Sequence, residues 1–345
     1  MAKRPTIADL AAEASVSVAT VDRVLNGRLP VREETAHRVY EAANAIGYHA
    51  AGLIRHRLQQ DLPHYHLGFI LQRPDQPFYQ AFARELKNAV ENAQRFRGTA
   101  HIDHFVTRTP TEVAAKLEEV AARCRAVAMV SVDHPTITAA VADLKEKGIP
   151  VFSLLSDFAS GVRESYIGLD NRKVGRTAAW MIAKAAKKPG KVAIFVGSHR
   201  FHGHELREIG FRTFFREHAP EFEVIDTLVN LDDHHIAQEA SFDLLQRYPD
   251  LAGLYLAGGG MEGAIAALRE EGLARASRLV TVCNEITPDS RAALAEGLIT
   301  LVIATPLERL SRELVAQMGH AIETGGADTP GQIFLPFDMH ISETI

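Results

Sequence analysis

The sequence predicts two architectures in one chain: an N-terminal all-α helix-turn-helix domain, then an α/β domain of two interleaved subdomains with parallel sheets. Three observations predict this. Short helical segments with capping residues fill residues 1–48. Apolar runs of strand length alternate with helical stretches over residues 64–345, and 345 residues suffice for two or three compact domains. Residues 49–63 are expected to form a hinge or linker between the two domains.

The composition excludes several classes of protein. With 46% hydrophobic residues and a net charge of -5, the chain is not intrinsically disordered. Its apolar runs stop well short of the ~18 residues that a membrane span needs, so no membrane partner is expected. No secretory signal is apparent. Cys124 and Cys283 form no C-x-x-C pair, which excludes a disulfide scaffold and a zinc finger and predicts reduced thiols in a cytoplasmic protein.

Two short helices joined by a three-residue turn open the chain. Thr6 is expected to cap the first helix, with Asp9 three residues on as in a capping box. Ser17 is expected to cap a second helix over residues 18–25, and a third helix is expected over residues 31–46. This order of helices is typical of a DNA-binding helix-turn-helix, although a helical hairpin used only for packing fits the same pattern.

Charge is distributed unevenly along the chain. Residues 1–60 hold eight Lys and Arg against six Asp and Glu, so this segment carries +2 and the rest of the chain carries -7. The asymmetry fits an anionic partner at the N-terminus, and it fits an ordinary solvated surface equally well.

The N-terminal segment resembles the lactose/galactose-repressor (LacI/GalR) family of transcriptional regulators. The resemblance rests on five short sequence segments: TIADLA, ASVSVATV, RVLN, REET and AIGY, which are residues 6–11, 14–21, 23–26, 32–35 and 45–48. It implies that the second helix enters the major groove of double-stranded DNA, where each base pair presents a distinct pattern of donors and acceptors.

The resemblance also assigns residues to the DNA contact. Val18 and Ala19 match the specificity positions of the family, and because they are apolar they are expected to contact thymine methyl groups. Arg23 is expected to bond a guanine with two hydrogen bonds. The remaining candidates, chiefly for phosphate contacts that position the domain, are Thr6, Ser17, Thr20, Asn26 and Thr35.

One residue of the second helix departs from the family pattern. Asp22 stands where serine is most common, and a carboxylate beside DNA phosphates is repulsive unless it is paired. Asp22 can instead orient Arg23 or accept a hydrogen bond from a cytosine amino group.

The family resemblance implies a hinge that becomes helical on DNA and wedges a leucine from each protomer into the minor groove. Leu58 is the candidate wedge, with Arg55 and Arg57 near phosphates. The segment lacks the usual proline-asparagine pair after Tyr48, and Leu58 lies one residue later than the common spacing. A plain linker is the alternative.

Strand-like and helical segments alternate over the rest of the chain, about 280 residues. Strands are expected at 67–71, 126–131, 151–155, 192–196, 251–257, 279–283 and 299–304. Helices are expected at 78–95, 111–123, 172–186, 205–218, 236–248 and 307–323. This alternation predicts parallel sheets covered on both faces, with a ligand cleft between two subdomains at the carboxyl ends of the strands.

This region resembles the effector-binding and dimerisation domain of the same family, which is similar to periplasmic sugar-binding proteins. The resemblance rests on the sequence segments at residues 76–79, 167–171, 206–211, 257–260 and 285–288. It implies that the effector is a sugar or polyol. Aromatic rings suit the C–H faces of such a molecule, and charged planar groups suit its hydroxyls.

Candidate ligand residues follow from matched positions. Phe78 and Tyr79 are expected to stack on the ligand unless they are core residues of a helix start, Arg207 and Glu285 to grip its oxygens, and Asp170 to contact it unless it is an N-cap. The full set is Gln76, Phe78, Tyr79, Ser156, Asp157, Asp170, Arg207, Asp232, Gly260 and Glu285.

Several positions depart from the family pattern in the predicted cleft. The family's carboxylate falls near Leu155 or Ser156, with Asp157 displaced by one or two positions. Its polar residue near the glycine run falls at Gly260 or Met261, and its glutamine before a proline falls at Ala304. The pocket is therefore expected to be more apolar, or to use other polar side chains, of which the candidates are His199, His202, Asp232 and Asp233.

No metal, cofactor or enzymatic activity is expected. His199, His202 and His204 have metal-like spacing, but Arg200 lies among them and Glu205 is the only nearby carboxylate. The run of three glycines at 258–260 lacks the lysine of a phosphate-binding loop, and no nucleophile elbow is present.

The sequence thus predicts a cytoplasmic transcriptional regulator, a repressor in the simplest case, whose affinity for DNA responds to a small molecule. A homodimer, or a higher oligomer, is expected because one helix-turn-helix reads half of a palindromic operator. One alternative is a small-molecule-binding protein or sugar-acting enzyme whose N-terminal helices serve assembly only. Another is an architectural DNA binder that has lost its ligand response.

Overall fold

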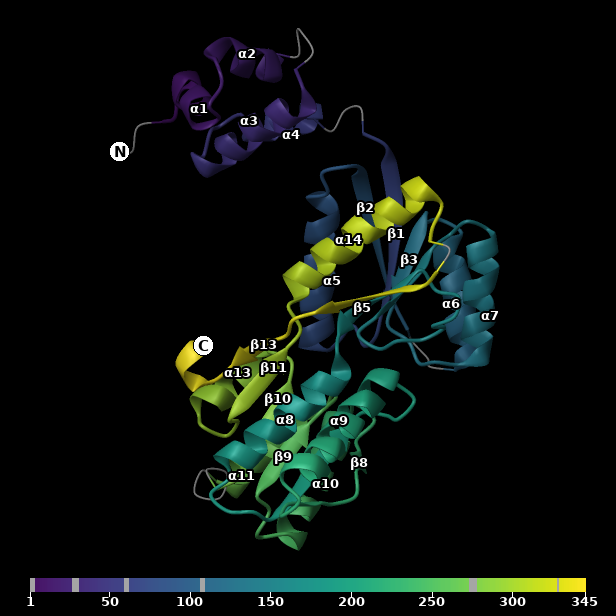
Figure 1. Cartoon of the computed structure of the whole chain (residues 1–345), viewed down its shortest axis with the longest axis vertical. Coiled ribbons are helices and arrows are strands. Elements are labelled where there is room, and N and C mark those ends of the chain that lie inside the picture. Colours follow the sequence, from purple (N-terminus) through teal and green to yellow (C-terminus); the bar gives the residue numbers. More distant parts are fainter. Residues whose placement is uncertain (1–3, 27–30, 59–61, 106–108, 273–277, 328) are drawn as a thin grey trace. The chain divides into compact units, whose positions relative to one another are not determined.

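The computed structural model describes residues 4–26, 31–58, 62–105, 109–272, 278–327 and 329–345 (Figure 1). The side chains of Glu33 and of residues 55–58 also lie outside the described part. The chain divides into a first unit, residues 1–65 with 91–99, and a second unit, residues 66–90 with 100–345. None of the described helices is long and apolar enough to span a membrane.

Four helices form the N-terminal region: α1 (Ile7–Glu13), α2 (Val18–Asn26), α3 (Glu33–Ala45) and α4 (Ala51–Leu58). The predicted capping box is confirmed, because Thr6 N–H donates to Asp9 and Asp9 N–H donates to Thr6 Oγ1. Ser17 Oγ likewise accepts the N–H of Thr20 at the start of α2. The residues at the centre of this region are fully buried and come from all four helices: Leu10, Val21, Val39 and Ile54.

The predicted hinge contains a helix. α4 packs on the N-terminal core through Ile54, which is fully buried, and Tyr48 is buried just before it. An apolar contact therefore holds part of the predicted hinge as a helix on the N-terminal core. That this segment becomes helical on DNA stays a prediction. The side chains of Arg55, Arg57 and Leu58, predicted to contact DNA, lie outside the described residues.

The first sheet has strands in the order β12-β5-β4-β3-β1-β2. They are β1 (His64–Leu71), β2 (Arg97–His104), β3 (Ala126–Met129), β4 (Val151–Leu154), β5 (Ser165–Leu169) and β12 (Gly331–Leu335). The pairings of β1 with β3, β3 with β4, β4 with β5 and β5 with β12 are parallel. Helices α5 (Pro77–Glu91) and α14 (Leu307–Thr324) cover one face, and α6 (Pro110–Ala121) and α7 (Pro135–Glu146) the other (Figure 1).

The second sheet has the order β13-β11-β10-β9-β6-β7, and β8 also pairs with β6. Its strands are β6 (Lys191–Val196), β7 (Glu223–Val224), β8 (Leu228–Val229), β9 (Gly253–Leu256), β10 (Val280–Asn284), β11 (Leu301–Ala304) and β13 (Asp338–His340). β13 is antiparallel to β11. The covering helices are α8 (Asn171–Ala185), α9 (His202–His218), α10 (His234–Arg247), α11 (Met261–Glu271) and α13 (Pro288–Ala295). A short 3-10 helix, η1 (Ser342–Thr344), follows β13.

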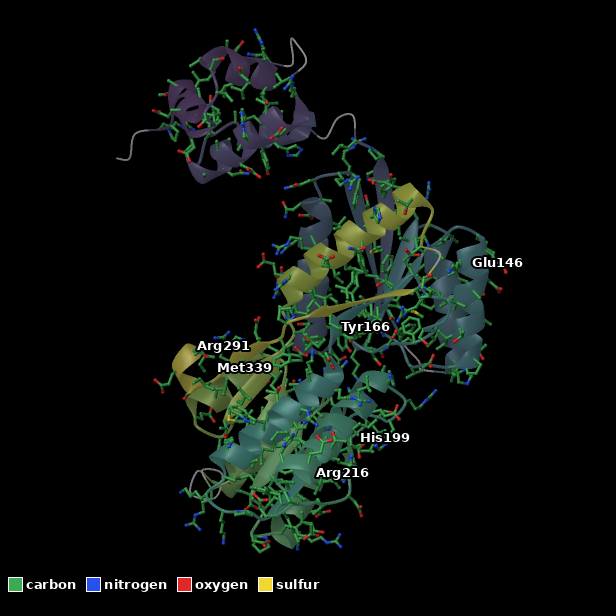
Figure 2. All side chains as sticks on the ribbon, in the orientation of Figure 1. Glu146, Tyr166, His199, Arg216, Arg291 and Met339 are labelled. Carbon is green, nitrogen blue, oxygen red and sulfur yellow. The ribbon has the colours of Figure 1, made fainter. Side chains whose placement is uncertain are left out.

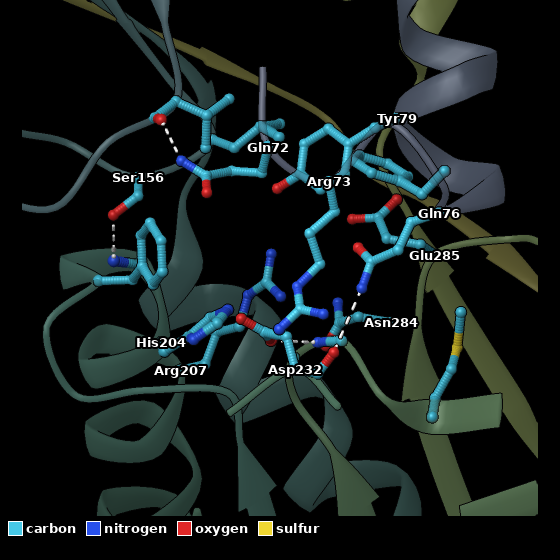
Figure 3. Close-up of a pocket in the computed structure, with 18 of the residues that line it drawn as sticks. Gln72, Arg73, Gln76, Tyr79, Ser156, His204, Arg207, Asp232, Asn284 and Glu285 are labelled. Atoms are coloured by element: carbon cyan, nitrogen blue, oxygen red, sulfur yellow. Dashed lines mark hydrogen bonds between the residues drawn. The ribbon is translucent and has the colours of Figure 1, made fainter. Parts of the chain in front are cut away.

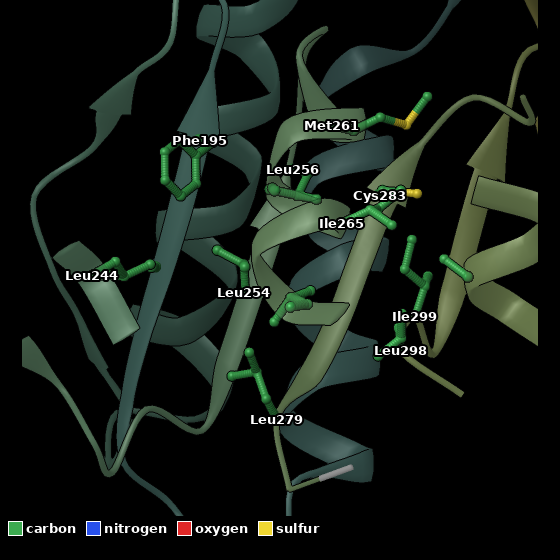
Figure 4. Close-up of a cluster of buried hydrophobic side chains, with 14 of the residues drawn as sticks. Phe195, Leu244, Leu254, Leu256, Met261, Ile265, Leu279, Cys283, Leu298 and Ile299 are labelled. Carbon is green, nitrogen blue, oxygen red and sulfur yellow. The ribbon is translucent and has the colours of Figure 1, made fainter. Parts of the chain in front are cut away.

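The core of the second sheet explains why the sequences of its strands are apolar. Phe195, Leu256 and Cys283, on three of the strands, belong to one buried cluster with Leu244 and Ile265 of the covering helices (Figure 4). A parallel sheet covered on both faces buries both sides of each strand. Both cysteines of the chain are free and buried, as predicted, and burial raises the pKa of the Cys124 thiol to about 11.

The chain passes between the two sheets three times, at residues 169–171, 304–307 and 335–338. Tyr166, labelled in Figure 2, lies beside the first of these passages. Its buried hydroxyl donates to Leu169 O and accepts from Asn171 Nδ2, so the passage is held by side-chain hydrogen bonds. The prediction of parallel sheets in an effector-binding fold is confirmed, and the three passages interleave its two halves.

Candidate functional site

The exposed face of α2 is the first candidate site. Val18 is 46% exposed, although it is a large apolar side chain, and Ala19, Asp22, Arg23 and Asn26 are exposed on the same face of the helix. The opposite face, with Val21 and Val24, is buried in the helical core. Packing does not need these exposed residues, so they are free to contact a partner.

Asp22 has a hydrogen-bond partner on its own helix. Its Oδ1 accepts from Asn26 Nδ2 over 2.6 Å, one turn further on. Among the described residues Arg23 forms no ion pair, so its exposed guanidinium remains available to a base. Of the two alternatives for Asp22, the structure shows a bond to Asn26 in place of one to Arg23, and a hydrogen bond from a cytosine amino group stays a prediction.

Of the predicted phosphate contacts, Thr6, Ser17, Thr20 and Thr35 lie near helix starts, whereas Asn26 is the last residue of α2. Thr6 and Ser17 already cap their helices, and Ser17 Oγ and Thr20 Oγ1 lie 2.9 Å apart. Thr35 is half-buried in the first turn of α3. Caps fix the helix starts, and the exposed backbone N–H groups there suit anionic groups.

The second candidate site is a cavity of about 100 Å³ at the carboxyl ends of strands from both sheets (Figure 3). Seven of the predicted ligand residues line it: Gln76, Phe78, Tyr79, Ser156, Arg207, Asp232 and Glu285. The prediction missed five polar residues that also line it: Gln72, Arg73, His204, Glu262 and Asn284. This position is where ligands bind in open α/β folds.

Arg207 of α9 forms the floor of the cavity. It is only 8% exposed, its Nε donates to Asn171 Oδ1 over 2.7 Å, and its Nη1 donates to Ala257 O over 2.7 Å. Close packing of α8 on α9 sets its position, since a Cβ on Gly175 would lie 1.9 Å from Arg207 O. Two fixed bonds pre-orient the guanidinium for an oxygen-rich ligand.

Glu285 sits directly after β10 in a left-handed conformation, with φ +70°. Its carboxylate accepts from Thr305 N–H over 2.9 Å and from Thr305 Oγ1 over 2.7 Å. Burial raises the pKa of this carboxyl, and the nearby charge of Arg207 together with the Thr305 bonds limits the rise. Thr305 therefore orients Glu285 at the cavity wall.

Asp232 also has a left-handed backbone, with φ +55°. Its Oδ1 accepts from Gly259 N–H over 2.8 Å. A Cβ on Gly197 would overlap this carboxylate at 1.8 Å, so glycine is required at the end of β6 to accommodate it. The glycine run after β9 serves the same contact, because Gly258 and Gly259 line the cavity.

His204 lies in the first turn of α9, and its Nδ1 accepts from Ser198 N–H over 3.3 Å. Burial lowers the pKa of His204 to about 4, although the neighbouring Asp232 opposes the shift. The imidazole is therefore neutral near pH 7 and presents Nε2–H as a donor.

The three histidines with metal-like spacing do not converge. His199 Nε2 lies 3.0 Å from Glu208, and His202 Nδ1 lies 3.2 Å from Glu205. His199 lies at the surface of the second sheet's helices (Figure 2). The described part of the chain contains no group of three or more His, Cys, Asp or Glu placed to hold a metal ion.

Three predicted ligand residues do not line the cavity. Asp157 is bonded to the buried Arg163, with Arg163 Nη2 donating over 2.7 Å, and also accepts from Ser153. Burial opposes ionisation of Asp157, but these hydrogen bonds bring its pKa below the usual value. Asp170 caps α8 by accepting from Lys173 N–H, the alternative named above. Gly260 precedes α11 with φ +77°.

The aromatic pair Phe78 and Tyr79 lines the cavity. Phe78 and Tyr79 begin α5 with ring centroids 5.1 Å apart in an edge-to-face arrangement, and Phe201 lines the cavity from the second sheet's side. Phe78 and Tyr79 are half-buried rather than core residues. Such rings suit the apolar face of a sugar.

Two hydrogen bonds join the two sides of the cavity. Arg73 Nη2 donates to Leu231 O over 2.9 Å, and Gln76 Nε2 donates to Asp232 O over 3.3 Å. Arg73 and Leu231 have φ of +21° and +54°, in the region that L-residues rarely adopt. Such outliers concentrate at ligand sites.

Residues 67–326 match the family model of the periplasmic binding protein domain, and residues 6–50 match that of bacterial regulatory proteins, lacI family. The chain belongs to the periplasmic binding protein domain family and carries a lacI-family helix-turn-helix domain. The resemblance of the N-terminal sequence segments to the LacI/GalR family is therefore confirmed.

Two relatives align with most of the chain. An uncharacterized HTH-type transcriptional regulator in the aml 5' region of Streptomyces limosus is 28% identical over 284 residues, which cover 78% of this chain and 75% of the relative. The HTH-type transcriptional regulator GalS of Salmonella typhimurium is 23% identical over 287 residues, 83% of this chain and 82% of GalS.

The fold of the second unit is shared with solute-binding proteins. A solved structure of an ABC transporter solute-binding protein from Agrobacterium vitis with bound D-fucose aligns with a TM-score of 0.73 at 16% identity. The alignment covers 81% of this chain and 96% of that protein.

Proposed function

We propose that this protein is a transcriptional regulator that binds a specific DNA sequence and whose affinity for that sequence is controlled by a small molecule in the cavity. The observation that carries the proposal is the pairing of an exposed, apolar-and-basic helix face in a lacI-family domain with a ligand-type cavity in the same chain. The relatives named above are regulators of the same class.

On DNA, α2 is proposed to lie in the major groove. Val18 and Ala19 contact thymine methyl groups there, and Arg23 donates two hydrogen bonds to a guanine. One such helix reads a half-site, so we propose a homodimer on a palindromic operator, acting in the cytoplasm as a repressor. The bond between Asp22 and Asn26 leaves the second carboxylate oxygen of Asp22 free to accept from a base amino group.

In the cavity, the proposed effector is a sugar or polyol. The rings of Phe78, Tyr79 and Phe201, the buried Arg207 and the carboxylate of Glu285 line the cavity, and the similar solute-binding protein holds D-fucose. A ligand that binds one arrangement of the two halves better shifts the chain toward it, and a coupling of ~1–3 kcal/mol suffices for a typical switch.

The test is selection of bound sequences from a random DNA pool by the full-length protein at two salt concentrations. We expect an enriched palindrome. Arg23→Met should lose the preference for guanine at one position of each half-site, with affinity falling about 5- to 150-fold, equivalent to ~1–3 kcal/mol. Arg38→Met, at an exposed arginine of α3, is the matched control and should leave the sequence preference unchanged.

The opposite outcome is equally clear. No enriched sequence, together with affinity that vanishes at ~0.2 M salt, would leave only electrostatic binding to phosphates and would contradict the proposal.

A further inference from the structure

Two consecutive residues at the end of β1 carry polar atoms that the protein does not use. Gln72 Oε1 and Arg73 Nε are buried, both residues line the cavity, and neither atom has a hydrogen-bond partner among the described residues. Buried polar atoms are rarely left unpaired, because desolvation without a bond is costly. An unpaired acceptor and an unpaired donor that line one cavity indicate a ligand whose polar groups bond to both.

The protein fixes the orientation of both side chains. Gln72 is 5% exposed and its Nε2 donates to Val130 O over 2.7 Å, which turns Oε1 toward the cavity. The Nη2 of Arg73 donates to Leu231 O over 2.9 Å on the other side of the cavity, which holds the guanidinium. Figure 3 shows both side chains pointing into the cavity. Neither can turn away to find another partner without breaking its existing bond.

The chemistry of these two atoms selects the ligand group. A hydroxyl donates its hydrogen to Gln72 Oε1 and accepts from Arg73 Nε. A carboxylate or phosphate dianion has no hydrogen for Gln72 Oε1, and an ammonium group has no lone pair for Arg73 Nε. We propose that Gln72 and Arg73 form a specificity pair that recognises a hydroxyl, or two adjacent hydroxyls, of an uncharged polyol. This deepens the proposed function and rests on it.

Arg73 also links recognition to the arrangement of the two sides. The same guanidinium that faces the ligand through Nε holds Leu231 O through Nη2, and Leu231 and Asp232 are in left-handed conformations. A ligand oxygen on Nε fixes the guanidinium plane and so strengthens the contact across the cavity. Arg73 thereby acts as ligand contact and cross-cavity tie in one side chain.

The test measures thermal melting and titration calorimetry of the full-length protein with two sets of probes. Neutral aldoses and alditols of four to six carbons, including D-fucose, D-galactose and xylitol, form the first set. D-Galacturonate and D-galactose 6-phosphate form the second. We expect a neutral probe to bind, and we expect the anionic partners of that probe to bind at least tenfold more weakly.

Variants locate the effect in the pair. Gln72→Met and Arg73→Met should each weaken the best neutral probe about 10- to 100-fold. Gln80→Met is the matched control, because Gln80 is an exposed glutamine of α5 that does not line the cavity and whose Nε2 donates to Pro74 O; it should weaken binding less than about twofold. A deoxy analogue that lacks the recognised hydroxyl should bind wild type and Gln72→Met equally.

Three results would contradict the assignment of Gln72 and Arg73 as a specificity pair. Binding of anionic probes in preference to neutral ones, equal losses in Gln72→Met and Gln80→Met, or no neutral probe bound by a well-folded protein would each do so. Operator binding of each variant without a probe is measured alongside. Wild-type DNA affinity in Gln72→Met shows that the variant is folded and that the DNA function stands, whatever the cavity result.

Discussion

The two sides of the cavity differ in how their polar groups are used. On the second sheet's side, Arg207, Asp232 and Glu285 are each bonded to other groups of the protein. On the first sheet's side, Gln72 and Arg73 each keep one buried atom unpaired. The polar groups on the second sheet's side are therefore oriented in advance by bonds within the protein, as precise binding requires. On the first sheet's side, we expect the ligand to supply the missing hydrogen-bond partners.

The strongest way to break this comparison is Arg207→Met. The change leaves Asn171 Oδ1 and Ala257 O without their donor and removes the positive charge near Glu285. We expect the free energy of unfolding to fall by about 2–4 kcal/mol in urea titrations, and the ligand response to be lost. Arg176→Met, which removes a surface ion pair with Glu217, is the control and should cost under about 1 kcal/mol. Equal losses in the two variants would show that Arg207 is not part of a pre-organised wall.

A smaller effect is expected from pH through His204. Because burial lowers the folded-state pKa to about 4, the unfolded chain binds the proton more tightly, and stability is lost as pH falls from about 6.5 toward 4. Between pH 7 and 5 we expect wild type to lose about 1–2 kcal/mol more than His204→Gln in urea titrations. His202→Gln, at an exposed histidine, should behave as wild type. A His204→Gln variant with the full wild-type pH dependence would rule out this assignment.

The smallest effect is expected from Thr305→Val. The valine keeps the backbone N–H bond to Glu285 and removes the bond from the hydroxyl. We expect a loss of about 1 kcal/mol in the free energy of unfolding and a further rise in the pKa of Glu285. Thr213→Val, whose hydroxyl bonds only carbonyls of its own helix, is the comparison and should cost less. If the order were reversed, Glu285 would not depend on Thr305 for its orientation.

Local signals predicted much of the fold. Caps such as Thr6 with Asp9 mark helix starts within four residues of sequence, and apolar runs mark strands buried on both faces. Edge strands escaped prediction. β2 is half-exposed along nearly its whole length and β12 alternates in burial, so neither forms an apolar run. The expected helix over 78–95 ends at Glu91.

The cavity was predicted only in part. Sequence segments that match the family identify which positions correspond, but they do not show which groups each side chain bonds to. Arg207 and Glu285 line the cavity as expected. Asp157 instead bonds to Arg163, which lies six residues later in the sequence. Gln72 and Arg73 were not predicted as ligand residues, and His204 was considered only for its metal-like spacing. Nothing in the local sequence shows that their side chains meet at the carboxyl ends of strands from two different sheets.

The three passages of the chain between the sheets also bear on how such proteins diversify. Each half of the α/β region is assembled from separate stretches of sequence, so no single cut in the gene can replace one wall of the cavity. The helical region that contains α2 is one continuous stretch, residues 4–58. A single recombination event can therefore give an existing cavity a new reading helix, while a new ligand specificity must arise by point substitution within the cavity.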